Sequence, residues 1–205
     1  MAPIINKATR TVYYPAPKCA SVTLRELYFE IENGYPFRKF TINGEDMDLF
    51  WLYGHGELFA PIDVPPGHDV IAVVRDPVDR FLSFYRWGVI DNHCNFESPI
   101  EINDFVANFA TLLNRTAKIR FHLSAQMMFI GMDLSRYDRI FRIEELAELE
   151  RYLSERSQTE IKIRRLNTTS RQSITSQLTP ASRARLVEIY REDYELLKDF
   201  YSPGS

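Results

Sequence analysis

The fold is decided by an apolar run that ends on an arginine and restarts at a proline: Val70-Ile71-Ala72-Val73-Val74-Arg75-Asp76-Pro77. Five apolar residues in a row are typical of a strand that is buried on both faces, and such strands belong to parallel sheets covered by helices. Because proline suits the first turn of a helix, a helix is predicted from residue 77 to about residue 86. The stretch therefore predicts a strand, a short turn and a helix in succession.

The same alternation of strand and helix continues along the chain. Further strands are predicted over 11–14 and 137–142, and amphipathic helices over 21–32, 102–113, 118–129, 144–154 and 180–200. Glycines interrupt residues 40–59, and within them 49–53 fit either a strand or a helix. This alternation indicates an α/β fold, with one domain over residues 1–205 and a central, mainly parallel sheet flanked by helices.

Composition argues against several classes of protein. A net charge of −3 over 205 residues argues against a nucleic-acid partner held by a broad basic face. The two cysteines, Cys19 and Cys94, form no disulfide framework and lack the spacing of metal ligands. No window approaches about 18 consecutive apolar residues, and no signal peptide is visible. We therefore expect a soluble cytoplasmic protein with no membrane span and no nucleic-acid partner.

A first candidate anion site lies where the 11–14 strand gives way to a helix, at Lys18-Cys19-Ala20-Ser21-Val22-Thr23. Small residues let the backbone approach an anion, and Lys18 supplies a positive charge. Ser21 and Thr23 supply hydroxyls at a helix N-terminus, where backbone N–H groups lack intrahelical partners. The turn does not have the Gly-x-x-x-x-Gly-Lys-Ser/Thr pattern of P-loop nucleotide binders. The alternative is a capped helix with a solvated lysine.

A second candidate anion site follows the 70–74 strand. Arg75 stands at the carboxyl end of a predicted parallel strand, where α/β sheets bind their ligands. Its planar guanidinium matches a phosphate group, and Ser83, about two helical turns later, adds a hydroxyl. Arg80 is expected to brace the helix. The alternative is an ion pair between Arg75 and Asp76 at a plain helix start.

Together the two segments resemble the sulfotransferases that use 3′-phosphoadenosine 5′-phosphosulfate (PAPS), in particular the carbohydrate-type, family 2-like enzymes. The 18–23 turn is similar to their 5′-phosphosulfate loop, commonly Pro-Lys-Thr-Gly-Gly-Thr-Ser, although Val22 stands where a hydroxyl residue is usual. Residues 137–146 and 189–196 also resemble segments of that family. The resemblance implies a P-loop-nucleotide-kinase-like fold. It further implies that PAPS is bound by Lys18, Cys19, Ala20, Ser21, Val22, Thr23, Arg75 and Ser83.

The resemblance implies transfer of a sulfuryl group to a hydroxyl, a reaction in which positioning and charge stabilisation dominate. Lys18 would stabilise charge on the bridging oxygen, and no metal is expected because the sulfuryl group carries less charge than a terminal phosphate. A base must accept the proton of the acceptor hydroxyl. The first candidate base is His55, within Tyr53-Gly54-His55-Gly56; His122, in a His-x-x-x-Gln segment, is the second, and a carboxylate such as Glu57 is the third.

The acceptor is expected to be a carbohydrate or glycolipid, held by variable loops such as 37–59 and 90–114. Its identity and the oligomeric state stay open. Two other functions also stay open. One is a P-loop-like nucleotide-dependent kinase, against which the missing glycines and Mg²⁺ carboxylates count. The other is a catalytically inactive module that binds a nucleotide or a partner.

Overall fold

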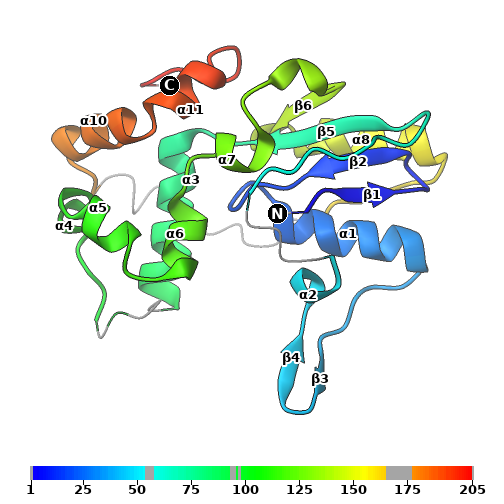
Figure 1. The fold of residues 1–205 in the computed structure, drawn as a ribbon, viewed down its shortest axis with the longest axis horizontal. Coiled ribbons are helices and arrows are strands. Elements are labelled where there is room, and N and C mark those ends of the chain that lie inside the picture. The colour runs from blue at the N-terminus through cyan, green and yellow to red at the C-terminus, as the bar shows by residue number, and fades with distance from the viewer. Residues whose placement is uncertain (1, 54–57, 93–95, 97, 165–176, 205) are drawn as a thin grey trace. The chain divides into compact units, whose positions relative to one another are not determined.

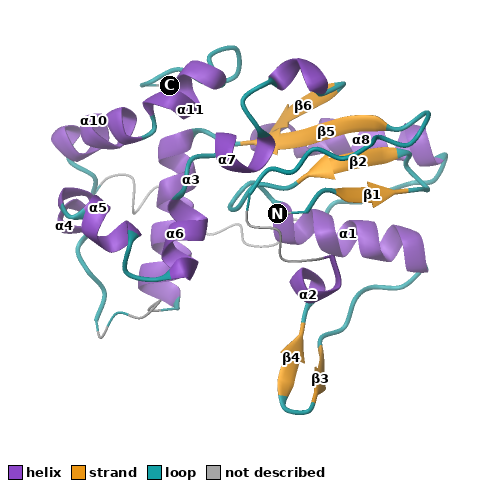
Figure 2. Cartoon of the chain, viewed as in Figure 1, coloured by secondary structure: helices purple, strands orange, loops and turns teal. Residues whose placement is uncertain are grey.

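The structure is a computed structural model that describes residues 2–53, 58–92, 96, 98–164 and 177–204. The chain divides into two compact units, one comprising residues 1–74 and 128–167 and the other residues 75–127 and 168–205. The first unit contains the central sheet and its helices, and the described part of the second is helical (Figures 1 and 2). The single domain over residues 1–205 stays a prediction.

The sheet of the first unit has four strands in the order β1-β2-β5-β6. Three neighbouring strands run parallel, as predicted: β2 (Thr11–Tyr14), β5 (Asp69–Val74) and β6 (Arg139–Arg142). The fourth strand, β1 (Ile4–Asn6), pairs antiparallel with β2, so the sheet is mixed. The sequence did not indicate this short edge strand, because three residues are too few for a periodic pattern.

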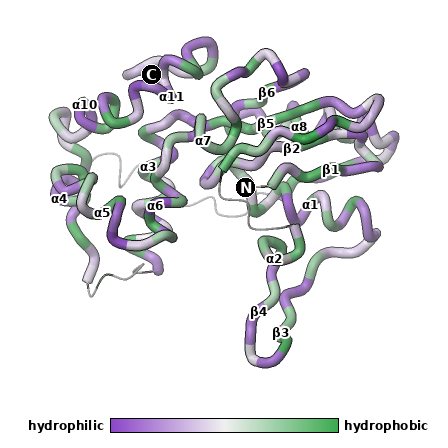
Figure 3. The backbone as a smooth tube through the Cα atoms, viewed as in Figure 1, coloured by the Kyte–Doolittle hydropathy of each residue, from purple (hydrophilic) through white to green (hydrophobic). Residues whose placement is uncertain are grey.

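Strand β5 confirms the expectation from its apolar run. Residues 70–74 are buried, and Figure 3 shows the hydrophobic stretch along this strand. Helices α1 (Ser21–Asn33) and α8 (Leu146–Ser157) flank the sheet (Figure 1). Tyr28 of α1 hydrogen-bonds through its hydroxyl to the hydroxyl of Thr11 in β2, at 2.8 Å, and ties the helix to the sheet.

A small hairpin and a short helix extend the first unit: β3 (Phe40–Ile42), β4 (Glu45–Met47) and α2 (Leu49–Tyr53). Asn43 and Gly44 both have positive φ, 51° and 84°, which a tight two-residue hairpin turn of the I′ type requires. The segment 49–53, which fitted either a strand or a helix, is a helix. A carboxylate oxygen of Asp48 accepts the Phe50 N–H at 2.9 Å and supports its first turn.

The described helices of the second unit are α3 (Pro77–Phe84), a π-helix (Tyr85–Asp91), α4 (Ile102–Ala107), α5 (Phe109–Leu113), α6 (Ala117–Leu123), α10 (Pro180–Ile189) and α11 (Arg191–Leu196). Their core is aromatic. Phe81 and Tyr85 both pack against the ring of Phe105, with centroids 5.8 and 6.0 Å apart. Edge-to-face contacts of this kind add to the free energy of apolar burial.

Three helices predicted as continuous are broken in the structure. The 102–113 helix divides at Asn108 and the 180–200 helix at Tyr190. The 118–129 helix divides into α6 and α7 (Met127–Ile130), because the N–H groups of Gln126 and Met127 donate to a carboxylate far along the chain. Of the helices in the described ranges, none combines the length and apolar character that a membrane crossing requires.

Candidate functional site

The first predicted anion site is a tight turn between β2 and α1. The N–H of Cys19 donates to the carbonyl of Ala16 at 3.2 Å, and both residues are buried. Lys18 and Ala20 have left-handed backbones, with φ of 66° and 59°. This region costs residues with a Cβ roughly 1–2 kcal/mol each. Strained non-glycine residues of this kind cluster at binding sites, where the surroundings hold them in place.

Helix α1 begins directly after this turn, and within the described part of the chain no side chain caps its N-terminus. The unpaired N–H groups of its first turn and the positive end of the helix dipole therefore favour an anion. Ser21 is buried and Thr23 is half-buried, whereas Val22 is exposed. The structure thus places Lys18, Ser21 and Thr23 around one helix terminus, as the sequence predicted.

Arg25, one helical turn after Ser21, is a candidate that the sequence interpretation missed. It is 1% exposed, its Nη1 reaches the Ser21 carbonyl at 3.5 Å, and its Nε and Nη2 have no hydrogen-bond partner among the described residues. The guanidinium lies 4.2 Å from the centre of the Phe50 ring. Burial lowers the pKa of Arg25 to about 10. A buried cation with unsatisfied donors is costly, so this arrangement adds positive character beneath the helix terminus at the expense of stability.

A signal for Arg25 exists in the sequence. The residue lies between Leu24 and Tyr28, within the buried side of an amphipathic helix, where an unpaired charge is unusual.

The second predicted anion site depends on the side chain of Gln126. Its Oε1 accepts the backbone N–H of Arg75 at 3.0 Å, and its Nε2 donates to the backbone carbonyl of Arg75 at 2.7 Å. Both residues are buried. The paired hydrogen bonds fix the backbone of Arg75 directly after β5, at the position from which the sequence predicted phosphate binding. Gln126 belongs to the His-x-x-x-Gln segment, whose function the sequence did not reveal.

Helix α11 supports this arrangement through Asp193 and Tyr194, together with its N-cap residue Tyr190. Asp193 accepts the N–H groups of Gln126 and Met127, at 2.8 and 3.0 Å. Tyr190 donates its hydroxyl to the Leu123 carbonyl at 2.9 Å, and Tyr194 donates to the Asp76 carboxylate at 2.9 Å. Burial raises the pKa of Asp193, while the charge of Arg80 and the two N–H donors act in the opposite direction.

The start of α3 is stabilised by an N-terminal cap from Asp76 and by hydrogen bonds from Arg80. Asp76 accepts the N–H of Asp79 at 2.9 Å, and Pro77 occupies the first turn, which is the plain helix start that the sequence allowed. Burial raises the pKa of Asp76. Arg80 donates to the carbonyls of His122 and Ser124, at 3.0 and 2.5 Å, so it braces α3 as expected. Ser83 lies in the last turn of α3 and is half-buried.

Of the three candidate bases, only His122 lies among the described residues. His55 and Glu57 lie outside the described residues. His122 lies in α6, with its ring stacked on Phe84 at 5.7 Å between centroids and 4.8 Å from the Trp87 ring. This aromatic packing favours a structural role for His122, and its role as a base stays a prediction. In the described part of the chain, no three His, Cys, Asp or Glu side chains are grouped to hold a metal ion.

Replacing Gln126 with Met is expected to lower the free energy of unfolding by about 2–6 kcal/mol, because two buried backbone groups of Arg75 lose these hydrogen bonds and each loss costs about 1–3 kcal/mol. Urea denaturation measures the change. Gln177→Met, at an exposed position of the same unit, is the control and is expected to stay within about 0.5 kcal/mol. A loss for Gln126→Met as small as that of the control would contradict the role assigned to Gln126.

A comparison with known proteins identifies the family of the segment that contains Gln126 and Asp193. The model of the sulfotransferase family matches residues 87–202, more than half of the chain. The matched segment contains Gln126 and Asp193, and it begins after Arg75 and Ser83. No curated protein and no solved structure matches the chain. The chain belongs to the sulfotransferase family.

Proposed function

We propose that the chain transfers a sulfuryl group from PAPS to a hydroxyl of a carbohydrate or glycolipid acceptor. The observation that carries the proposal is the paired hydrogen bonding of Gln126 to Arg75, which presents an arginine at the end of a parallel strand. Family membership supports sulfuryl transfer in general. The donor is inferred from the chemistry of the two anion sites, and the acceptor class from the resemblance to carbohydrate-type sulfotransferases.

The two anion sites suit the two ends of PAPS. At the 5′-phosphosulfate end, Lys18, Ser21 and Thr23 supply a charge and hydroxyls, and Cys19, Ala20 and Val22 supply backbone. Buried Arg25 adds positive charge at this end. At the 3′-phosphate end, the guanidinium of Arg75 and the hydroxyl of Ser83 donate to the phosphate oxygens. Neither assignment needs a metal ion.

The proposed reaction is an in-line displacement at sulfur. A bond forms between the acceptor oxygen and sulfur, and the bond between sulfur and the bridging oxygen of the donor breaks. The electron pair of that bond stays on the bridging oxygen, where Lys18 stabilises the charge. The proton of the acceptor hydroxyl passes to a base, for which we retain His55 first, His122 second and Glu57 third.

Thermal denaturation tests the donor. Adenosine 3′,5′-bisphosphate is expected to raise the melting temperature by several degrees, because a ligand at about 100 times its Kd stabilises the native state by about 2.7 kcal/mol. ADP, without a 3′-phosphate, is expected to have a much smaller effect. Arg75→Ala should abolish the shift, whereas Arg120→Ala, an exposed arginine of the same unit, should retain it. Equal stabilisation by ADP and the bisphosphate would count against PAPS.

Two histidine variants test the base. His55→Ala is expected to reduce turnover by roughly 10²–10⁴-fold, the usual worth of general-base catalysis, and to leave the Kd for the bisphosphate within about twofold. His122→Phe retains a ring against Phe84, and its turnover is expected to stay within a fewfold of the native value. If His122→Phe loses more activity than His55→Ala, the base is His122. If neither variant loses activity, both histidines are excluded.

A further inference from the structure

We infer that a pocket in the first unit binds the apolar part of the acceptor, and that the acceptor is an amphipathic glycoside instead of a free sugar. The inference rests on the proposed function, because it concerns the acceptor of the same reaction. It narrows the choice between carbohydrate and glycolipid.

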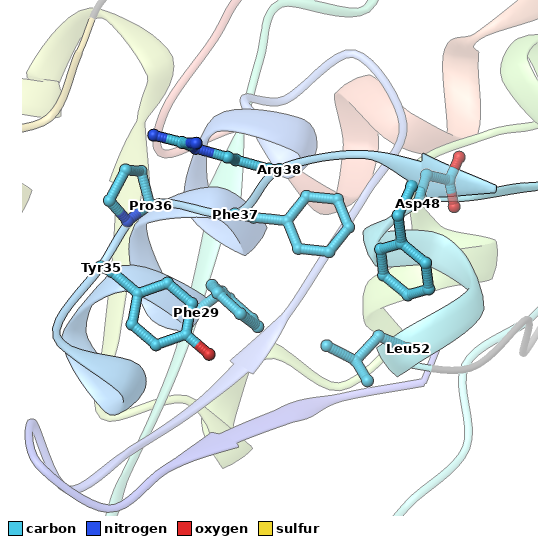
Figure 4. Close-up of a pocket in the computed structure, with 8 residues that line it drawn as sticks. Phe29, Tyr35, Pro36, Phe37, Arg38, Asp48 and Leu52 are labelled. Atoms are coloured by element: carbon cyan, nitrogen blue, oxygen red, sulfur yellow. The ribbon is translucent and has the colours of Figure 1, made fainter.

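The pocket has a volume of about 520 Å³, which falls within the range of roughly 300–1,000 Å³ for small-molecule sites. It is lined by the end of α1, the 35–38 segment, β3, Asp48 and α2. Six of its lining side chains are apolar or aromatic: Phe29, Tyr35, Pro36, Phe37, Phe40 and Leu52. Figure 4 shows the side chains of Phe29, Phe37 and Leu52 directed toward the same space.

The apolar lining is both ordered and open. The ring of Phe29 meets the rings of Tyr35 and Phe37 edge to face, with centroids 5.7 and 5.2 Å apart, and these contacts fix the ring orientations. Yet Tyr35 is 59% exposed, Phe40 49% and Leu52 50%. A concave apolar surface that stays exposed is a candidate binding site.

The polar residues of the pocket indicate which end of a ligand lies where. Arg38 and Asp48 are its charged lining residues. Arg38 is exposed and Asp48 is half-buried, and in Figure 4 the guanidinium of Arg38 points away from the rings of Phe29 and Phe37. A guanidinium donates hydrogen bonds and a carboxylate accepts them, and sugar hydroxyls do both. An alkyl or aryl group therefore suits the interior, and a sugar suits the rim.

The pocket lies on the same helix as the phosphosulfate turn. Ser21, Arg25 and Phe29 are spaced four residues apart and share one face of α1. At about 1.5 Å of rise per residue, Phe29 lies roughly 12 Å along the helix from Ser21. Arg25 lies between them, against Phe50 of α2, the helix that also contributes Leu52. A sugar linked to an apolar group spans such a separation, whereas a free monosaccharide at the turn leaves the pocket unfilled.

Isothermal titration of the full chain tests the inference, with octyl β-D-glucoside below its micellar concentration, methyl β-D-glucoside and octanol as probes. Octyl glucoside is expected to bind at least tenfold more tightly than either of the others. Leu52→Glu should weaken its binding at least tenfold. Met132→Glu, at a position that is 75% exposed in the same unit and does not line the pocket, should leave binding unchanged. If octyl and methyl glucoside bind equally, or if Leu52→Glu has no effect, the pocket does not bind the apolar part of the acceptor. If octanol binds as tightly as octyl glucoside, the inference that the acceptor is a glycoside is wrong.

A parallel titration with adenosine 3′,5′-bisphosphate separates this inference from the proposed function. If the bisphosphate binds and octyl glucoside does not, the inference fails and the proposed function stands. If octyl glucoside binds and the bisphosphate does not, the proposed function fails, and the acceptor role of the pocket fails with it. The inference is supported when both bind and PAPS sulfates octyl glucoside faster than methyl glucoside.

Discussion

The hydrogen bonds between Gln126 and the backbone of Arg75 are the constraint on which the second anion site depends. Where a strand ends, its next N–H and C=O leave the ladder, and a buried backbone group without a partner costs about 1–3 kcal/mol. One amide side chain satisfies both groups of Arg75. Asp193 holds Gln126 in turn, and Tyr194 holds Asp76 beside it. The family-matched region thus supplies the framework for an arginine that lies outside it.

The anion site of the first unit depends on backbone strain and a buried charge. In the turn before α1, Lys18 and Ala20 have left-handed backbone conformations. Within α1, Arg25 is buried, and two of its guanidinium nitrogens have no hydrogen-bond partner among the described residues. Each feature lowers the stability of the free protein, and an anion at the helix terminus would offset part of that cost. The aromatic pocket lies farther along the same helix. In our proposal, α1 therefore positions both the phosphosulfate end of the donor and the apolar part of the acceptor.

Local sequence patterns predicted the elements but not the contacts between them. The apolar run at 70–74 and the periodic helix at 21–32 are confirmed, because burial and amphipathicity determine both. The helix predicted over 118–129 is divided in the structure, because Asp193, 67 residues from Gln126, accepts the N–H groups of Gln126 and Met127 that would continue it. Arg25 and the pocket were missed for a similar reason, since their surroundings come from separate elements. His55 lies outside the described residues, and its role stays a prediction.

A crystal structure of the chain with adenosine 3′,5′-bisphosphate tests the central claim most directly. We expect the 3′-phosphate to lie within hydrogen-bonding distance, about 3 Å, of the Arg75 guanidinium and the Ser83 hydroxyl. The 5′-phosphate should lie at the N-terminus of α1, beside Lys18. A nucleotide whose phosphates contact only one of these two sites, or neither, would contradict the assignment of the two anion sites to the two ends of PAPS.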